Sequence, residues 1–329
     1  MKEFSKSIFL LFITLALCFS LLEGILHLLI KENYDVWILS KSLDKAPDPV
    51  CRLPPNTTIV NERYIKQKKV TEIIPINSQC IRDYEYSLAK PKDTYCIIGI
   101  GDSFTFGSSV KLEDSYLKQL EKMLNSDDKK IRYEVINIGV PGYNLENKLE
   151  ILTKKGLAYN PNLVIIQLYS DDWMTVFPAR HIIYQSENNS DFKVFEVVQS
   201  IDKKFKGKIK LINLLDHYLE KRLTEKAFKE LIPPPEKAIE KTNRILNNLS
   251  TLSNKTNISY LFITIGVDKN IRELIKEQNF SIIDVDEILA SYKISEITID
   301  YPQDPHFNPL GNKVIAKAIY QSLKSDLNE

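Results

Sequence analysis

The sequence predicts an α/β fold built on a parallel sheet that helices cover on both faces. Short, continuously apolar runs occur at 95–100, 133–138, 163–168, 259–264 and 280–284. Segments with the helical spacing of apolar residues separate most of these runs. Strands buried on both faces are apolar at successive positions, as these are. Alternating strands and helices of this kind indicate a parallel sheet.

The first element is an apolar segment at residues 8–30. As a helix it would be about 34 Å long at roughly 1.5 Å per residue, enough to cross a hydrocarbon core of about 30 Å. Lys2 and Lys6 precede it, so the positive-inside rule places residues 1–7 in the cytoplasm. We therefore expect a single-pass cell-membrane protein, with a transmembrane anchor at 8–30 and everything beyond it extracytoplasmic.

Polar residues and a cysteine within this segment bear on that interpretation. Glu23 and His27 lie four residues apart, on one helix face near its outer end, where they can pair. A cleaved signal peptide would be shorter and followed by an A-x-A-like site, which is not present. The residues before Cys18 loosely resemble a lipoprotein processing site, but Leu17 is large for that position. A retained anchor is favoured, and a cleaved or lipidated N-terminus is the alternative.

Residues 31–93 are polar and contain several prolines, which predicts a stalk and an N-terminal arm that wraps the main domain. A strand-like piece lies at 72–76. In an oxidising space Cys51 and Cys80 could pair, although three cysteines beyond the anchor allow three pairings. Cys96 lies in an apolar run and is interpreted as a buried thiol.

The main domain is expected at 94–329, with an insertion at about 171–234 that interrupts the strand–helix alternation. The insertion is rich in aromatic residues, includes a predicted helix near 211–227, and is closed by the prolines at 233–235. Outside it, helices are predicted at 114–124, 145–157, 237–252 and 269–277, and from Pro309 towards 323.

Composition excludes several classes of function. The chain has 44 Lys plus Arg against 43 Asp plus Glu, a net charge of +1, which argues against a nucleic-acid binder. Four cysteines in 329 residues rule out a disulfide scaffold. The glycine-rich turn at 99–107 lacks the lysine of a phosphate-binding P-loop and the third glycine of a dinucleotide fingerprint.

Polar residues at the ends of the predicted strands mark a candidate site. Ser103 follows the first of these strands, and ligands bind beyond the carboxyl ends of strands in parallel α/β sheets. By itself, Ser103 is equally well explained as a helix N-cap. Gly139 lies in a turn after the second strand, and Asp171 and Asp172 follow the third.

Only four histidines occur in the chain, and one of them fits this site. His27 belongs to the anchor, whereas His181 and His217 lie in the insertion and are interpreted as surface or packing residues. His306 precedes the last helix, with Asp304 two residues before it. An acid so placed can orient the imidazole, and His306 could then act as the base for a nucleophilic serine.

Four motifs together resemble the SGNH (GDSL-type) hydrolase superfamily: GDSFTFG, NIGVPGYN, SDDW and DPHFNPLGN. The resemblance covers about Thr94–Leu323 apart from the insertion. It implies a flavodoxin-like three-layer sandwich with a serine esterase or acyl-transfer centre, and neither a metal nor an organic cofactor. Carried over residue by residue, it makes Ser103 the nucleophile, His306 the base and Asp304 the residue that orients it.

The resemblance also implies an oxyanion hole and shows one departure from the family. The N–H groups of Ser103 and Gly139 would be donors, and the family's third donor is an asparagine. Asp171 occupies that position here, and an ionised aspartate cannot donate a hydrogen bond. Either Asp171 is protonated, or another residue such as Ser170 replaces it, or activity is weak or lost.

The sequence as a whole predicts an exported, membrane-anchored serine esterase or O-acyltransferase. Its expected substrates are acyl esters, either small esters or acylated glycans of the cell envelope. The alternative is a catalytically weak or inactive protein of the same fold that binds glycans or serves as a scaffold in the envelope. The membrane, through residues 8–30, is the expected partner, and nucleic acid is not.

Overall fold

The computed structural model describes residues 2–29, 50–65, 68–127, 130–170, 172, 235–301 and 304–328, with scattered residues between 194 and 222. The chain divides into two compact units. One comprises Met1–Val36, Lys66–Lys69 and Ala179–Glu230, and the other comprises Trp37–Ile65, Val70–Pro178 and Leu231–Glu329. The second unit holds the sheet and the N-terminal arm.

A five-stranded parallel sheet forms the centre of the second unit, as predicted. Its order is β4-β3-β5-β6-β7. The strands are β3 (Thr94–Ile100), β4 (Arg132–Asn137), β5 (Leu163–Tyr169), β6 (Ser259–Ile265) and β7 (Ser281–Asp284). Each neighbouring pair runs parallel. The order is the flavodoxin-like one, with a switch point between β3 and β5, where such sheets bind ligands.

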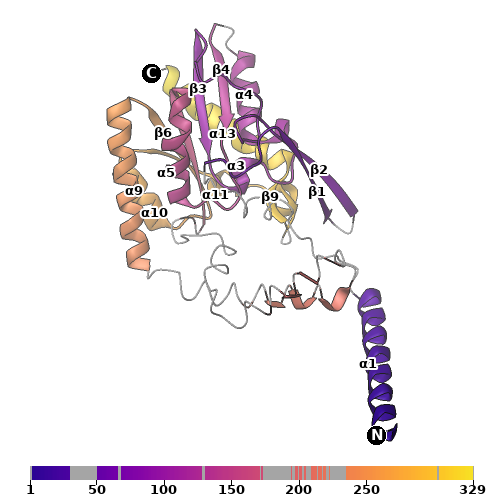
Figure 1. The fold of residues 1–329 in the computed structure, drawn as a ribbon. Coiled ribbons are helices and arrows are strands. Elements are labelled where there is room, and N and C mark those ends of the chain that lie inside the picture. Colours follow the sequence, from indigo (N-terminus) through magenta and orange to yellow (C-terminus); the bar gives the residue numbers. More distant parts are fainter. Residues whose placement is uncertain are drawn as a thin grey trace. The chain divides into compact units, whose positions relative to one another are not determined.

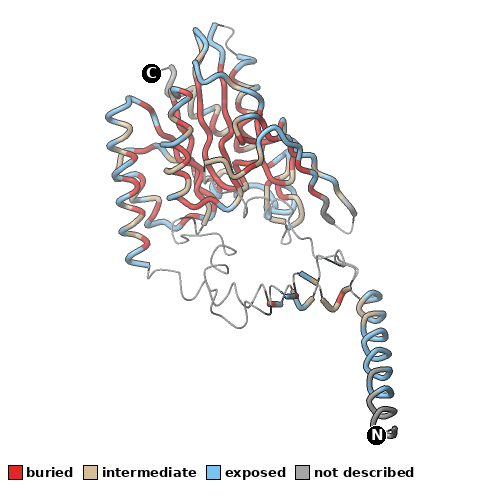
Figure 2. Tube along the Cα trace, viewed as in Figure 1, coloured by how far each residue is buried: buried red, intermediate tan, exposed pale blue. Residues whose placement is uncertain are grey.

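Helices cover both faces of this sheet and produce three layers (Figure 1). On one face lie α5 (Leu145–Lys154), α9 (Pro235–Thr256) and α10 (Lys269–Glu277). On the other lie α4 (Tyr116–Asp127), α11 (Val285–Leu289) and α13 (Pro309–Asn328). Successive side chains of a strand point to opposite faces, so Ile97 packs with one helix layer and Ile98 with the other. Figure 2 shows the buried residues concentrated along the strands.

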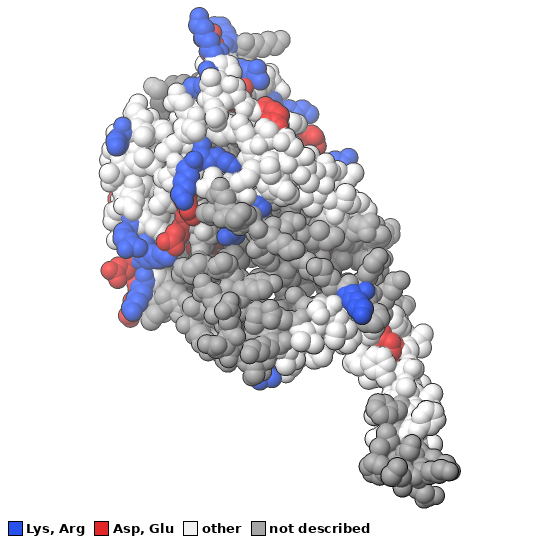
Figure 3. Space-filling view, viewed as in Figure 1, with Lys and Arg blue, Asp and Glu red and all other residues white. Residues whose placement is uncertain are grey.

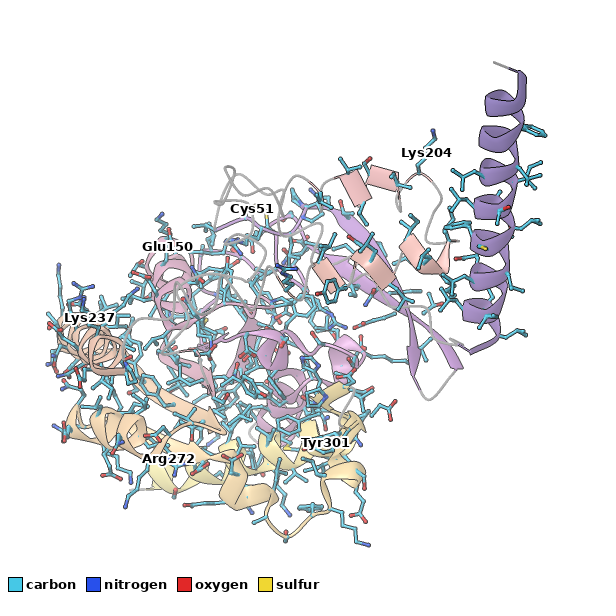
Figure 4. The ribbon with its side chains drawn as sticks, turned by 90° about the horizontal axis from the view of Figure 1, so that it is seen from below. Cys51, Glu150, Lys204, Lys237, Arg272 and Tyr301 are labelled. Atoms are coloured by element: carbon cyan, nitrogen blue, oxygen red, sulfur yellow. A yellow bond between two sulfur atoms is a disulfide. The ribbon has the colours of Figure 1, made fainter. Side chains whose placement is uncertain are left out.

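Three labelled charged residues identify the helices of the first layer. Glu150, Lys237 and Arg272 belong to α5, α9 and α10, respectively (Figure 4). On the face drawn in Figure 3, described residues of both signs are interspersed, as a net charge of +1 would suggest.

Several element boundaries differ from the prediction. The helix expected over 145–157 ends at Lys154 and continues as a short 3₁₀ helix, Gly156–Tyr159. Pro235, expected to close the insertion, is instead the first residue of α9. Proline is accommodated there because the first helical residue needs no N–H donor. Of the helix predicted near 211–227, the described residues up to 222 are helical.

The N-terminal arm is more regular than the sequence indicated. β1 (Thr57–Ile65) and β2 (Lys68–Ile76) form a two-stranded sheet, which extends the strand expected at 72–76. A disulfide joins Cys51 to Cys80, the pairing that the sequence left open. Leu53 and Ile74 from the arm are buried in the same core as α5 and α9. The arm is therefore an integral part of this unit.

A buried aspartate also ties the arm to the sheet. Asp83 accepts the Asn137 N–H at 2.6 Å and lies 2.8 Å from the Lys118 ammonium. Burial raises the pKa of Asp83 to about 6, against the opposing effect of Lys118. Cys96 is buried as predicted, and burial raises the pKa of its thiol to about 12.

The other unit begins with α1 (Lys2–Leu29). Its stretch Phe9–Leu28 is long and apolar enough to cross a membrane, although a signal sequence would meet the same criterion. Glu23 and His27 pair at 3.1 Å, as their spacing predicted. The Glu23 carboxylate also accepts the backbone N–H groups of Lys210 and Leu211, the latter at 3.0 Å. Described residues near 210 thus bind the C-terminal part of α1.

Removing the Cys51–Cys80 disulfide should destabilise the arm and the core that it covers. The bridge closes a loop with a sequence separation of 29. Loop-closure entropy then predicts that Cys51→Ser/Cys80→Ser lowers the free energy of unfolding by about 3 kcal/mol. Urea denaturation of the wild type and the variant, each with and without reductant, measures this. Reductant should shift the wild-type midpoint and leave the variant unchanged. A wild type insensitive to reductant would contradict the prediction.

Candidate active site

Ser103 is the first residue of α3 (Ser103–Phe106), a short helix that starts directly after β3. The side chain of Asp102 caps it by accepting the Phe104 N–H at 2.8 Å. Gly107 ends it with a φ of 79°, a left-handed conformation that glycine adopts without strain. The N-cap role that the sequence allowed for Ser103 therefore belongs to its neighbour Asp102. The Ser103 hydroxyl is therefore available to bond His306.

Ser103, His306 and Asp304 form one chain of hydrogen bonds. His306 Nε2 lies 2.8 Å from Ser103 Oγ, and Nδ1 of the same ring lies 2.7 Å from Asp304 Oδ1. The His306 side chain is 13% exposed and that of Asp304 is 12% exposed, so the pair is largely desolvated but open to a reactant. The residues that the sequence named as nucleophile, base and orienter are thus brought together. Proton transfer from the hydroxyl to the imidazole needs this geometry.

Asp304 and His306 lie on β9 (Asp304–Phe307), which pairs antiparallel with β8 (Thr298–Asp300). Residues two apart in a strand share a face, which is why the carboxylate and the imidazole meet. The ring of Phe104 supports this arrangement, because its centroid lies 4.9 Å from that of His306 and 5.1 Å from that of Phe307. The sequence did not predict a strand at this motif.

A buried polar network behind Ser103 holds the end of β3. Gln167, on β5, accepts the Asp102 N–H at 3.0 Å and the Thr105 hydroxyl at 3.1 Å. It also donates to Asp102 Oδ2 at 3.2 Å. The Thr105 hydroxyl in turn bonds that of Tyr116 at 2.9 Å. A single glutamine in an otherwise apolar strand therefore fixes both the cap and the body of α3.

Lys148 supplies the positive charge in this interior. It is buried on α5, forms an ion pair with Asp172, and lies 3.8 Å from Asp102 Oδ2. Asp172 also accepts the Tyr169 N–H at 2.6 Å, which shapes the turn after β5. Burial raises the pKa of Asp172 to about 7, with Lys148 opposing and Asp102 reinforcing the shift. Sequence reasoning missed Lys148, because a lysine on an amphipathic helix is normally exposed.

The resemblance named the Gly139 N–H as an oxyanion donor, and in the structure this N–H is engaged with a neighbouring side chain. It donates to Asn137 Oδ1 at 2.9 Å. Asn137 Nδ2 donates to the Thr105 carbonyl at 2.8 Å, which fastens this turn to α3. A Cβ on Gly139 would lie 2.4 Å from the Phe106 nitrogen. The position requires glycine because two backbones approach closely there.

Asp171, the third expected oxyanion residue, lies outside the described residues, as do His181 and His217. Its neighbour Asp172 is described and is committed to Lys148 and the Tyr169 N–H. Asp172 is therefore part of the scaffold beneath the site.

The fold and this site place the chain among α/β proteins with a serine, a histidine and an aspartate at the carboxyl edge of a parallel sheet. The family model of GDSL-like lipases and acylhydrolases matches residues 97–319, more than half of the chain. The protein belongs to this family, and membership supports ester hydrolysis as its class of chemistry.

Solved structures with low sequence identity are similar to part of the chain. A two-domain esterase active on acetylated mannans, co-crystallised with mannopentaose, has 16% identity and a TM-score of 0.45, with 72% of this chain and 50% of that chain covered. The psychrotrophic esterase EstA from Pseudoalteromonas sp. has 14% identity, a TM-score of 0.43 and coverage of 71% and 99%. The acetyl xylan esterase AlAXEase has 15% identity, a TM-score of 0.42 and coverage of 69% and 98%.

The chain spans half the length of the first of these esterases. Among curated proteins, no sequence matches it.

Replacing Lys148 should destabilise the protein in a pH-dependent way. The pKa of Asp172 in the folded state, about 7, exceeds its unfolded value, so the stability that this carboxyl contributes is full below about pH 4 and lost as pH rises through 7. The charge of Lys148 limits this loss of stability because it attracts the ionised Asp172 carboxylate. Lys148→Met should therefore cost about 3 kcal/mol at pH 8 and clearly less at pH 5. Thermal or urea denaturation at both pH values measures this.

The matched control is Lys148→Met/Asp172→Asn, which removes both charges of the pair. It should recover most of the stability lost at pH 8, because a neutral pair avoids the cost of an unpaired buried charge. An equal loss for Lys148→Met at the two pH values would contradict this electrostatic account.

Proposed function

We propose that the protein is a membrane-anchored, exported serine esterase that cleaves acyl esters through an acyl-enzyme on Ser103. The observation that carries the proposal is the hydrogen-bonded chain from Ser103 Oγ to His306 Nε2, and from His306 Nδ1 to Asp304 Oδ1. Each contact has the distance at which a general base takes a proton from a nucleophile and an acid orients that base.

The reaction starts when Ser103 Oγ attacks the acyl carbonyl carbon and its proton passes to His306 Nε2. As the tetrahedral intermediate collapses, His306 returns the proton to the departing alcohol oxygen. The acyl group is then bound to Ser103, and water attacks its carbonyl carbon while His306 takes a proton from the water. The bond to Ser103 Oγ then breaks, the carboxylic acid leaves, and His306 returns the proton to Ser103. Asp304 keeps the imidazole in the required tautomer and stabilises its protonated form.

The oxyanion of the intermediate is assigned to the N–H groups of Ser103 and Gly142. The Val140 N–H donates to the Gly101 carbonyl at 3.0 Å. The turn after β4 therefore starts beside Gly101, two residues before Ser103. Gly142 follows in this turn with a φ of 78°, and a Cβ at this position would have no heavy atom within 4 Å. We propose its N–H as the second donor in place of that of Gly139, which is bonded to Asn137.

The proposed compartment rests on α1 and on the disulfide of the arm. α1 would hold the protein in the membrane, and the Cys51–Cys80 disulfide supports an oxidising, extracytoplasmic location for the residues beyond α1. We propose acylated glycans of the cell envelope as substrates, because an anchored enzyme meets them there. The same acyl-enzyme would serve an O-acyltransferase if a sugar hydroxyl replaced water.

The catalytic roles are tested with the full chain in detergent. Wild type should hydrolyse p-nitrophenyl acetate and be labelled by a serine-directed fluorophosphonate. Ser103→Ala should lose both activities, and Asp304→Asn should lower kcat by about 10⁴-fold, because the imidazole then takes the wrong tautomer. Intact-mass spectrometry reads the label. Labelling that persists in Ser103→Ala would show that another residue is the nucleophile.

The acceptor and substrate are tested by incubating the wild type with an acetylated oligosaccharide and, separately, with p-nitrophenyl acetate plus an unacetylated oligosaccharide. An esterase releases acetate from the first mixture and leaves the second oligosaccharide unmodified. Acetylated sugar in the second mixture would identify an acyltransferase. Turnover of the small ester without release from any acetylated glycan would reject the glycan proposal and keep the esterase.

A further inference from the structure

The loop at 107–110, between α3 and the next helical turn, contacts the site through a residue that the mechanism does not yet use. Ser109 Oγ donates to Asp304 Oδ2 at 2.8 Å. The other oxygen of that carboxylate accepts the His306 ring at 2.7 Å and the His306 N–H at 3.1 Å. The carboxylate is therefore held from both sides. The χ2 torsion of an aspartate side chain is broadly distributed when nothing restrains it. A second donor therefore restricts the rotation of the Asp304 carboxylate relative to the His306 ring.

Ser109 reaches Asp304 from a backbone conformation that serine rarely adopts, with a φ of 76°. Such a conformation persists only where the surroundings impose it. Here the guanidinium of Arg82 binds the carbonyls on either side of Ser109, that of Gly107 at 2.6 Å and that of Val110 at 2.6 Å. The loop is therefore clamped around Ser109.

A second contact from the arm acts on Ser109 itself. Glu72, on β2, accepts the Ser109 N–H at 3.2 Å and lies 3.6 Å from Arg82 Nη2. Arg82 is fully buried, and it follows the disulfide-bonded Cys80 by two residues. Glu72 and Arg82 thus connect the N-terminal arm to the loop that carries Ser109.

We propose that Ser109 is a positioning residue for the active site, and that Glu72 and Arg82 hold it in place. Its hydroxyl orients Asp304, and through Asp304 the imidazole that receives the Ser103 proton. The arm thereby contributes to the geometry of the reaction as well as to the stability of the fold. This inference rests on the proposed esterase function.

Two substitutions separate the hydroxyl of Ser109 from its backbone. Ser109→Ala removes the hydroxyl and keeps a side chain at positive φ, whereas Ser109→Gly removes the hydroxyl and relieves the backbone. If the hydroxyl positions Asp304, both variants should lower kcat for p-nitrophenyl acetate by roughly ten- to hundred-fold, as expected for loss of one hydrogen bond to a charged group, with KM unchanged.

Ser108→Ala is the matched control in the same loop. Ser108 is buried, and its hydroxyl has no hydrogen-bond partner among the described residues. The control variant should keep wild-type kcat and KM. Thermal melts check that each variant is folded, and if Ser109→Ala does not fold, Ser109→Gly carries the test. Wild-type kcat in Ser109→Gly would overturn the proposal, because it would leave only a backbone role for the residue.

A double-mutant cycle tests the link to the arm. Glu72→Ala removes the acceptor of the Ser109 N–H and should lower kcat in the wild-type background. The same change should have a much smaller effect in the Ser109→Gly background if Glu72 acts through Ser109. Additive effects would overturn that link. A wild type that neither turns over ester nor reacts with fluorophosphonate would instead refute the proposed function, so the two failures are distinguishable.

Discussion

The turn from β3 into α3 is the constraint on which the site depends. Gly101 has no room for a side chain, since a Cβ would lie 1.9 Å from Thr105 Oγ1 and 2.4 Å from Gln167 Oε1. The Asp102 carboxylate is buried directly after it and caps the helix. Because α3 begins at the next residue, the position of Ser103 relative to the end of β3 is fixed. His306 meets it there from 203 residues away.

Two buried lysines lie between the buried and half-buried carboxylates of this unit. Lys148 lies between Asp102 and Asp172, and Lys118 lies between Asp83 and Glu121. Burial raises the pKa of both Asp83 and Asp172 in spite of these cations, so desolvation outweighs the attraction. Such clusters stabilise little beyond an apolar core of the same volume. Their effect here is to define where the arm, the turn after β5 and α3 lie.

The sheet and its helices were predictable because continuous apolar runs and helical spacing are local signals. The strands Thr298–Asp300 and Asp304–Phe307 were not, since they are short and polar, and the second contains a proline tolerated in a two-stranded sheet. β1 was missed for a similar reason, because its residues mix polar and apolar types without strict alternation. Ser103, His306 and Asp304 were predictable only because each directly follows or precedes a recognisable element in a known motif.

The sequence by itself determined the α/β class and the apolar N-terminal segment, because both are local patterns of residue types. Its motifs also named the serine, histidine and aspartate that the structure brings together. Tertiary structure alone decided how several other polar groups pair. The Gly139 N–H is taken by Asn137, Lys148 is buried against Asp172, and Ser109 reaches Asp304 across a separation of 195 residues. Such contacts depend on how loops pack against the ends of strands, and no local pattern of apolar and polar residues encodes that packing.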